Sequence, residues 1–506
     1  MHNYTIWEDV MRSFISIVLT IIMLLSFVAC SGGSTDQPQD TTLSGDTTAS
    51  KPQNDIVYEE DDLPDDLRFD GETVKFLIVK TGVHDLFAEE LSSDIVNDSI
   101  YNRENFVEER LGVELEPMYI DPMTGGDFEK EVEKQHASDE DMYQLLGYST
   151  FAFTRFVFMN YFHDLYGVNY IDLEKPWWSQ TFNNEAEIKD SLYVTTGSLS
   201  LSLARSMFAI FYNKSVADEY AASIPELGDL YGLVDSGDWT FDKFHELGST
   251  IYEDNNGDTT ADEEDRFGLG FSSGIGIDFF WSSFDINLLS PTDDGWFESD
   301  IPTEKLYTSL EKMNTLLFDT PGCFDAGYGD EKLDTLSTML AGDNLLFMNN
   351  TLDAIETTTL RNMQSDYGIL PTPKFNEAQD NYYTYAHDSY TSFAIPKTNR
   401  NPDVAGAVLE AMASYAYRET EPAYLNTALK GKYMSDPQSR KMLDLVVDGF
   451  KVDAAWIYLE TLGAEYPSEM RIAIHNGDTN FASKHATLER RMNLRLKAYL
   501  TGSSFD

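Results

Sequence analysis

Twelve residues, from Asp254 to Asp265, carry oxygen-bearing groups at the spacing of a calcium-binding loop. Thr260, at loop position 7, can offer its backbone carbonyl. The side chains at positions 1, 3, 5, 9 and 12 are those of Asp254, Asn256, Asp258, Asp262 and Asp265. Because calcium is a hard cation that prefers oxygen ligands, this spacing predicts a bound calcium ion.

Two positions of this loop depart from the usual pattern. Thr259 stands at position 6, where glycine normally makes the sharp turn, and Asp265 is shorter than the usual closing glutamate. The alternative is a solvated acidic loop without an ion, since the chain has 87 aspartates and glutamates. A calcium sensor needs a second loop and a helix pair that opens, and the sequence shows neither, so we expect a structural ion.

The loop must be held by the elements on either side of it. A helix is predicted from Phe241 to Tyr252, with Thr240 as its N-cap, and a strand from Phe267 to Phe271. Strand-like and helical runs alternate through the rest of the chain. Strands are predicted at 74–79, 113–119, 142–146, 208–212, 344–348, 367–370 and 393–395, and helices at 99–111, 305–317, 333–340, 404–415 and around 488–500. This alternation predicts an α/β fold with two lobes.

Composition and charge narrow the function classes. At 506 residues and 42% hydrophobic content, the chain can bury a large core and should form more than one domain. Its formal charge of −52 repels nucleic acid and anionic lipid head groups, so we expect no nucleic-acid partner. The sequence contains no serine-hydrolase elbow, zinc-protease, Cys-x-x-Cys or phosphate-loop motif, which argues against an enzyme.

The N-terminal region has the pattern of an exported lipoprotein. Residues 1–29 end in an apolar run, 14–29, that is shorter than the roughly 20 residues a membrane-spanning helix needs. The run leads to Cys30 and small residues, and resembles a bacterial lipoprotein signal whose cleavage exposes a lipid-bearing cysteine. Residues 30–68 are polar and lack apolar periodicity, which predicts a disordered tether.

Several later segments resemble one protein family in order. These are Phe211-Tyr212-Asn213-Lys214, Asp238-Trp239-Thr240-Phe241, the acidic loop followed by Arg266-Phe267-Gly268, the run 340–348, the run 367–374 and Phe393-Ala394-Ile395-Pro396-Lys397. Together they resemble the extracellular solute-binding proteins of bacterial ABC importers, the family-1 type that includes maltose-binding protein. The resemblance covers nearly all of the chain after the tether.

This resemblance implies a periplasmic-binding-protein-like α/β fold, in which two lobes close by hinge bending around a ligand cleft. It assigns residues 70–198 and 390–430 to the first lobe, and residues 199–389 and 431–506 to the second lobe, which carries the loop 254–265. In relatives such a loop is a peripheral calcium site, in agreement with a structural ion.

Candidate ligand residues come from the chemistry of sugars and from positions in the resembling family. A sugar needs flat aromatic platforms and polar groups around them. At positions where relatives hold ligand we expect Tyr148 from the first lobe and Phe280 or Trp281 from the second, although neighbours in a helix point in different directions. Asn349 and Asn350 follow an expected buried strand, with a simple turn pair as the alternative, and His387 and Asp388 lie just before the returning strand. Trp178 is an aromatic candidate that packing would explain equally well.

We therefore expect a lipid-anchored component of an ABC importer on the extracytoplasmic face of the cell membrane, which binds a carbohydrate, and an oligosaccharide in particular. It would act as a monomer and deliver its ligand to the membrane permease. The alternatives are a secreted carbohydrate-active enzyme with a structural calcium site, and a binding protein for another solute such as a peptide.

Overall fold

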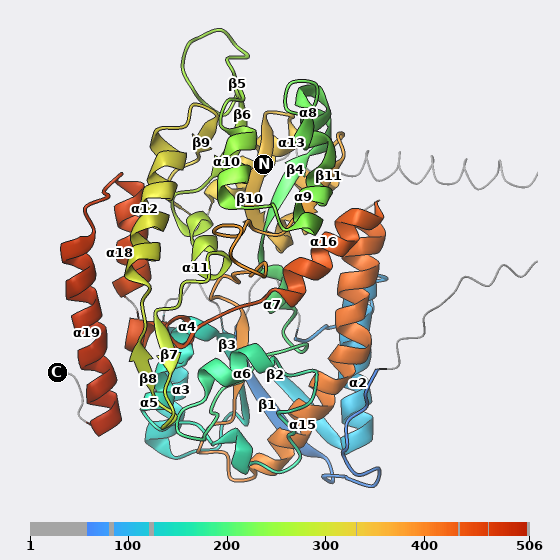
Figure 1. The fold of residues 1–506 in the computed structure, drawn as a ribbon. Coiled ribbons are helices and arrows are strands. Elements are labelled where there is room, and N and C mark those ends of the chain that lie inside the picture. The colour runs from blue at the N-terminus through green and yellow to red at the C-terminus, as the bar shows by residue number, and fades with distance from the viewer. Residues whose placement is uncertain are drawn as a thin grey trace, which may run out of the picture. The chain divides into compact units, whose positions relative to one another are not determined.

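The computed structural model describes residues 58–79, 86–120, 126–329, 331–433, 436–463 and 465–502. From Tyr58 onward the chain forms one unit, which contains two main β-sheets (Figure 1). The predicted signal segment, Cys30 and the tether up to residue 57 lie outside the described residues.

The first sheet has four strands, and one of its two central strands is buried except for its last residue. Its spatial order is β12-β3-β1-β2. The strands are β1 (Glu72–Val79), β2 (Val113–Ile120), β3 (Leu145–Ser149) and β12 (Thr391–Ala394). β1 pairs parallel with both β2 and β3, whereas β12 runs antiparallel to β3. The carboxyl ends of β1, β2 and β3 therefore lie at the same edge as the start of β12.

The second sheet is mixed, with the spatial order β11-β4-β10-β6-β5 and β9 paired to β6. Its strands are β4 (Phe208–Asn213), β5 (Tyr252–Glu253), β6 (Arg266–Phe271), β9 (Cys323–Asp325), β10 (Leu345–Thr351) and β11 (Tyr367–Leu370). β6, β9 and β10 are parallel, and β4 runs antiparallel to β10. The end of β10 and the start of β4 thus share one edge. A separate pair, β7 (Leu289–Pro291) and β8 (Phe297–Ser299), lies outside both sheets.

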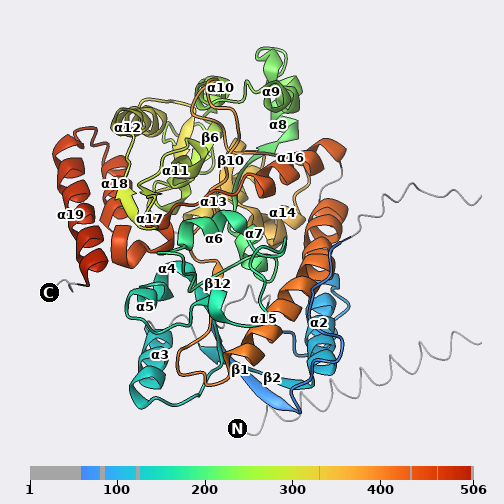
Figure 2. The same ribbon diagram turned by 60° about the horizontal axis from the view of Figure 1, so that its bottom comes forward.

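Helices pack against both sheets (Figures 1 and 2). The α-helices are α2 (Ile95–Leu111), α3 (Asp127–Ser138), α4 (Thr150–Phe153), α5 (Arg155–Phe158), α6 (Gln180–Ala186), α7 (Leu201–Arg205), α8 (Lys214–Tyr220), α9 (Leu230–Ser236), α10 (Phe241–Gly248), α11 (Phe279–Ser283), α12 (Thr303–Phe318), α13 (Lys332–Ala341), α14 (Thr358–Arg361), α15 (Pro402–Tyr415), α16 (Pro437–Asp448), α17 (Ala454–Ile457), α18 (Glu465–His475) and α19 (Ala482–Thr501). The short 3₁₀ segments are η2 (Leu165–Gly167), η3 (Pro225–Asp229), η4 (Ile275–Ile277) and η5 (Leu352–Glu356), and the π-helical segments are η6 (Ala416–Thr420), η7 (Ala423–Tyr433) and η8 (Leu459–Gly463).

Local chemistry explains several helix boundaries. The side chain of Asp94 caps α2 by accepting from the backbone N–H groups of Val96 and Asn97. Thr240 caps α10 in the same way by accepting from Lys243, as its sequence position predicts. That helix ends at Gly248, four residues before the expected Tyr252, because Tyr252 belongs to β5.

Two crossings between the sheets run side by side. The chain leaves the first sheet after β3 and enters the second at β4, and it returns after β11 to reach β12. Met207 on the first crossing forms a β-bridge with Ala386 on the return. Thr384, also on the return, pairs with Phe450 in the segment that follows α16. The two lobes are thus joined by adjacent extended segments. Connecting segments of this kind can act as the hinge when two lobes close around a ligand.

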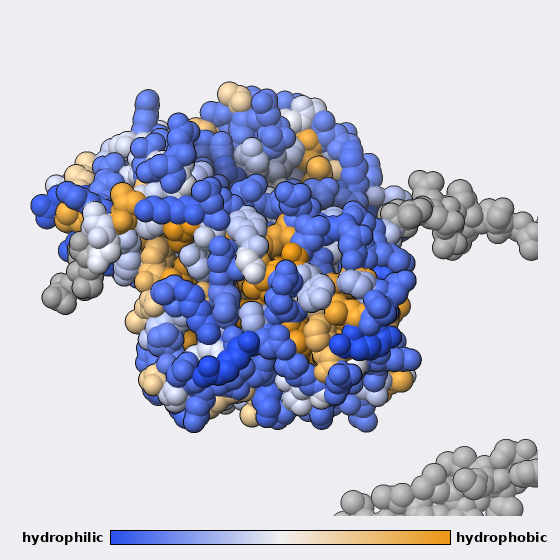
Figure 3. All heavy atoms as spheres, turned by 90° about the horizontal axis from the view of Figure 1, so that it is seen from below, coloured by the Kyte–Doolittle hydropathy of each residue, from blue (hydrophilic) through white to orange (hydrophobic). Residues whose placement is uncertain are grey.

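Residues 58 to 68 form part of the folded unit, so the predicted tether extends too far. Leu63 is buried, Asp61 pairs with Arg110 on α2, and the ring of Tyr58 meets that of Tyr417 edge to face. Leu63 is an apolar residue in an otherwise polar stretch, and its presence in the sequence indicates that this part of the chain packs against the folded unit. The face seen from below is mainly hydrophilic and is interrupted by hydrophobic patches (Figure 3), in keeping with the large charge excess.

Candidate functional site

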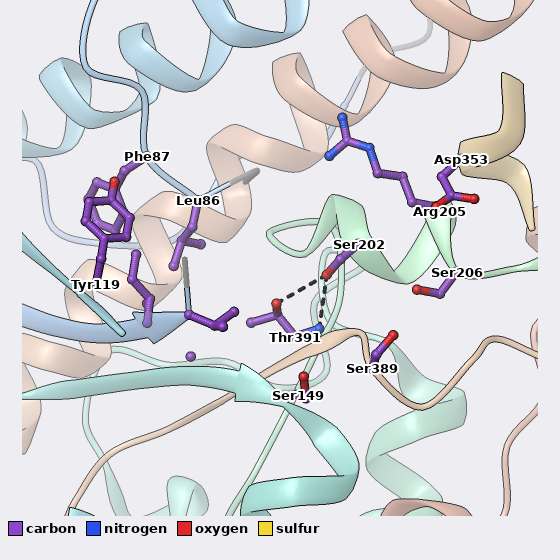
Figure 4. A pocket seen from close by; sticks show the side chains of 13 residues that line it. Leu86, Phe87, Tyr119, Ser149, Ser202, Arg205, Ser206, Asp353, Ser389 and Thr391 are labelled. Atoms are coloured by element: carbon purple, nitrogen blue, oxygen red, sulfur yellow. Dashed lines mark hydrogen bonds between the residues drawn. The ribbon is translucent and has the colours of Figure 1, made fainter. Parts of the chain in front are cut away.

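A pocket of about 210 Å³ opens where the carboxyl edge of the first sheet faces the start of the second lobe. Its lining comes from the ends of β1, β2 and β3, the start of β12, α7, η5 and the crossing segment (Figure 4). The lining residues are Ile78, Val79, Leu86, Phe87, Tyr119, Gly147, Ser149, Ser202, Arg205, Ser206, Asp353, Ser389 and Thr391. Ligands of open α/β sheets bind at such edges, so this pocket is the candidate ligand site.

Small residues keep the pocket open. A side chain at Gly147 would approach Phe393 and Ile78 to 3.2 and 3.3 Å, closer than most packed atoms come. Ser202 lies opposite, and its Oγ accepts from the backbone N–H of Thr391 at 3.0 Å and donates to Thr391 Oγ1 at 3.2 Å (Figure 4). This pair of bonds ties α7 to the first strand residue of β12 across the pocket.

Arg205 is the one cationic side chain among the described residues that line this pocket. Its Nε and Nη2 donate to the two carboxylate oxygens of Glu356 at 2.9 and 3.3 Å. Its guanidinium lies 4.8 Å from the ring centre of Tyr424, whose hydroxyl also donates to Glu356 at 2.8 Å. Glu356 therefore neutralises most of the charge that Arg205 would otherwise present to a ligand.

Asp353 supplies a carboxylate at the same wall. The hydroxyl of Thr351 donates to its Oδ1 at 2.5 Å. Burial raises the pKa of Asp353, the bond from Thr351 lowers it, and the charges of Glu356 and Arg205 act in opposite directions. Below that raised pKa the group becomes a donor as well as an acceptor, so its bonding to hydroxyls depends on pH.

A second cavity, of about 290 Å³, adjoins the first. The two share Ser206, Asp353 and Ser389. The second cavity is lined by residues of α13, the end of β10, η5 and the crossing segment, namely Ser206, Ile275, Leu333, Asp334, Ser337, Asn350, Thr351, Asp353, Ala354, Thr357, His387 and Ser389. Hydroxyl, amide and carboxylate groups dominate this lining, so the second cavity suits a ligand rich in hydrogen-bonding groups.

Tyr148 does not line either cavity. It is 9% exposed and its ring stacks on Phe128 of α3 with centres 3.9 Å apart. Its neighbours Gly147 and Ser149 line the pocket instead, because successive side chains of a strand point to opposite faces. The positions of β3 that line the pocket therefore carry glycine and serine, and Tyr148 supplies no aromatic platform there.

Phe280 and Trp281 lie in the core of the second lobe. Their rings stack at 4.7 Å, and Trp281, 1% exposed, meets Trp456 and Tyr466 edge to face. Trp178 is buried as well, and its Nε1 donates to Glu410 at 3.1 Å. These positions do not support ligand stacking by any of the three, since none of them lines the two adjoining cavities.

The polar candidates lie closer to the site. His387 lines the second cavity, and its Nδ1 shares a hydrogen bond of 2.8 Å with Ser389. Asp388 is buried 3.7 Å from the same nitrogen. Asn349 points away from the cavity and donates to the carbonyl of Gly276, whereas its neighbour Asn350 lines the cavity and donates to Ser337 at 3.0 Å.

The acidic loop has the backbone of a calcium loop in one respect. Thr259, at position 6, has φ of +67°, the left-handed conformation that glycine usually supplies there. The carboxylate of Asp254 accepts from the N–H groups of Gly257 and Thr259 at 2.7 and 3.1 Å. The turn therefore forms with a threonine at its tightest point.

Asp265 is fully buried at the end of this loop. It accepts from the N–H of Asn255 and the hydroxyl of Tyr252, both at 3.1 Å. No three acidic, histidine or cysteine side chains in the described residues are grouped as a metal site. Oxygen atoms are the ligands that calcium prefers, so the side chains of the loop suit this ion. In this structure the carboxylates of Asp254 and Asp265 accept hydrogen bonds from backbone N–H groups of the loop.

Sequence reasoning missed the residues that form the pocket wall, above all Arg205, Asp353 and Tyr119. Arg205 ends the short helix α7 at a lobe crossing, and Asp353 follows the buried strand β10 by two residues, four residues beyond the predicted Asn349. Tyr119 ends a predicted strand. The sequence indicates where each strand ends and therefore which segments reach the pocket. Which side chain at a strand end lines the pocket depends on the exact residue at which the strand stops. Within the described residues, no helix is long and apolar enough to span a bilayer.

No protein-family model and no curated protein matches this sequence. Solved structures do match over 85 to 86% of the chain and 99 to 100% of their own length. The sugar-binding protein MalE from Xanthomonas citri gives a TM-score of 0.54 at 11% identity. An ABC substrate-binding protein from Listeria monocytogenes in complex with cycloalternan gives 0.50 at 10%, and UgpB from Mycobacterium tuberculosis in complex with glycerophosphocholine gives 0.51 at 15%. The chain has the two-lobed α/β fold of the solute-binding proteins of ABC transporters.

Proposed function

We propose that this protein captures a carbohydrate of more than one sugar unit and delivers it to the permease of an ABC importer. The observation that carries the proposal is the hydroxyl-lined pocket between the lobes of a solute-binding fold. Such folds hold the ligand where the strands of both lobes end, and closure of the lobes reports that the site is filled.

The charges of the pocket favour a neutral ligand over an anionic one. Arg205 is already paired through two bonds with Glu356, and the carboxylate of Asp353 stands beside it. A phosphate or carboxylate group would have to displace Glu356 and approach Asp353, at an electrostatic cost in a partly buried site. Sugar hydroxyls can instead donate to Asp353 and exchange bonds with the serine and threonine hydroxyls.

The size of the site favours more than one sugar unit. The two cavities, of about 210 and 290 Å³, meet at Ser206, Asp353 and Ser389. A single monosaccharide filling one cavity would leave the polar groups of the other in contact with water. A ligand that spans both cavities pairs all of these groups, and its specificity would follow from those bonds.

Titration calorimetry of the purified protein against a panel of oligosaccharides tests the proposal, with chromatography of the mixtures afterwards. Binding without breakdown is the expected result. Hydrolysis of the bound glycan would favour the alternative, a carbohydrate-active enzyme. Binding of peptides or phosphodiesters in place of every glycan would also overturn the proposal.

The membrane attachment of the protein belongs to the same proposal. Lipid on Cys30 would hold the folded unit at the extracytoplasmic face, through the polar segment that ends before Tyr58. Growth with a labelled fatty acid tests this, because label should appear in the protein and be absent from a Cys30→Ser variant. Equal labelling of both would refute attachment at Cys30.

Calcium in the loop 254–265 is the remaining part of the proposal. Asp254, Asn256, Asp258, Thr260, Asp262 and Asp265 would hold the ion, with Thr259 already in the left-handed conformation. Extracellular sites of this kind bind calcium at roughly 10⁻⁴ to 10⁻³ M, so millimolar calcium should raise the melting temperature. A melting temperature that responds to neither calcium nor a chelator would refute the site.

A further inference from the structure

The first cavity is divided into an apolar end and a polar end. Ile78, Val79, Leu86, Phe87 and Tyr119 form the apolar end, and all of them lie at or beside the ends of β1 and β2. Figure 4 shows Leu86, Phe87 and Tyr119 grouped on one side of the pocket, with the labelled hydroxyl and charged side chains on the other.

The side chains of the apolar end are held in place by packing against the core. Leu86 and Phe87 are each 7% exposed, and the ring of Phe87 packs edge to face on Phe76 of β1 at 5.0 Å. Tyr119 is 39% exposed, so part of its side chain faces solvent beside the pocket. An apolar group placed against the exposed parts of these side chains removes apolar surface from water.

The polar end continues into the second cavity. Ser206, Asp353 and Ser389 stand at the junction, followed by Asn350 and His387. A glycan with hydroxyls on every side would satisfy this region, but at the apolar end the same hydroxyls would lose water and find only the hydroxyl of Tyr119 as a side-chain partner. Leaving such groups unpaired is costly, so the two ends select for different chemistry.

We infer that the preferred ligand is an amphiphilic glycoside, with its sugar units in the polar region and an apolar group against Leu86, Phe87 and Tyr119. The apolar group is either the methyl of a 6-deoxy sugar or a non-sugar substituent such as an alkyl or aryl aglycone. The inference rests on the proposed function, because it concerns the ligand of the same pocket.

Calorimetry with matched ligand pairs tests the inference and separates the two sources. One arm compares each disaccharide with the same disaccharide carrying a terminal 6-deoxy sugar. The other arm compares methyl, propyl and phenyl glycosides of one disaccharide. Each methylene that becomes buried should tighten binding about fourfold, since burial contributes about 0.8 kcal/mol per methylene and 1.4 kcal/mol is tenfold.

A gain in only one arm identifies the source of the apolar group, and a gain in both supports a tolerant apolar end. Equal affinity within every pair would overturn the inference while leaving carbohydrate binding intact. Failure of all glycosides to bind, with or without apolar groups, would overturn the proposed function instead.

Two variants on β2 locate the effect. Tyr119→Ala should remove most of the advantage of the apolar group, measured as the ratio of the two affinities within each matched pair. Met118→Ala is the matched control, because Met118 is 38% exposed and does not line the cavity. It should keep the full advantage. An equal advantage in the Tyr119→Ala variant and the wild type would refute the placement.

Discussion

Replacing Trp281 by alanine should destabilise the folded protein and leave its ligand affinity unchanged. Trp281 is 1% exposed, stacks on Phe280 at 4.7 Å, and meets Trp456 and Tyr466 at 6.2 and 6.3 Å. Removal of a large aromatic side chain from such a cluster leaves a cavity and costs about 3–5 kcal/mol of unfolding free energy. Aromatic pairs contribute beyond their buried area, which favours the upper part of this range.

The indole nitrogen of Trp281 supplies an internal control. Its Nε1 is buried and has no hydrogen-bond partner in the described residues. Trp281→Phe keeps a ring and removes this unpaired donor, whose burial costs about 1–3 kcal/mol. The phenylalanine variant should therefore be clearly more stable than the alanine variant, although the smaller ring fills less of the space.

Urea unfolding followed by circular dichroism measures both variants, and calorimetry with a bound oligosaccharide measures their affinity. The expected result is a lower urea midpoint for Trp281→Ala, with an unchanged Kd below the transition. If the alanine variant unfolds at the wild-type urea concentration and loses ligand binding, the ring contacts the ligand and the core assignment is wrong.

Three further predictions concern the pocket, a buried carboxyl and the acidic loop. Asp353→Asn should weaken oligosaccharide binding about 10- to 100-fold in calorimetry, because a hydrogen bond to a charged group contributes about 1.5–3 kcal/mol, and unchanged affinity would exclude Asp353 from the ligand. Burial raises the pKa of Glu410 from 4.5 to about 7, so the folded state binds its proton more tightly than the unfolded chain does, and stability is lost as pH rises from about 4.5 to 7. Glu410→Gln should remove up to about 3 kcal/mol of that loss in unfolding measured at pH 5 and pH 8, and an identical pH dependence in both proteins would refute this. Thr259→Gly should raise the melting temperature, because a β-branched residue at φ +67° costs roughly 1–2 kcal/mol, and a lower melting temperature would contradict the strained turn.

Elements with strong periodicity could be predicted from sequence. The strand expected at 74–79 is β1 (Glu72–Val79), and the helix expected at 404–415 is α15 (Pro402–Tyr415). The expected strand and helix alternation also takes in the segment 156–165, which in the structure begins within the short helix α5 and ends at the first residue of η2. Short apolar runs of this kind fit a strand and a buried helix equally well, and only the packing around them decides.

The candidate site was less predictable, because it depends on contacts between segments that are distant in sequence. Arg205 lines the pocket since Glu356 and Tyr424 hold its guanidinium there, and these partners are 151 and 219 residues away. The charge of Arg205 in the sequence gives no information about whether a ligand or a glutamate pairs with it. Local pattern therefore locates the strand ends, whereas the electrostatics of the pocket require the tertiary structure.

Aromatic content was also a misleading guide to the site, for a physical reason. Tryptophan buries a large apolar surface, so placing it in the core stabilises the fold, and Trp178 and Trp281 lie there. A pocket that must admit a ligand needs small side chains at the strand ends, as at Gly147 and Ser149. The alternation of side chains along β3 puts Tyr148 on the face opposite the pocket. An aromatic residue next to a predicted strand end can therefore indicate that its small neighbours line the pocket, as well as that the aromatic ring itself stacks on the ligand.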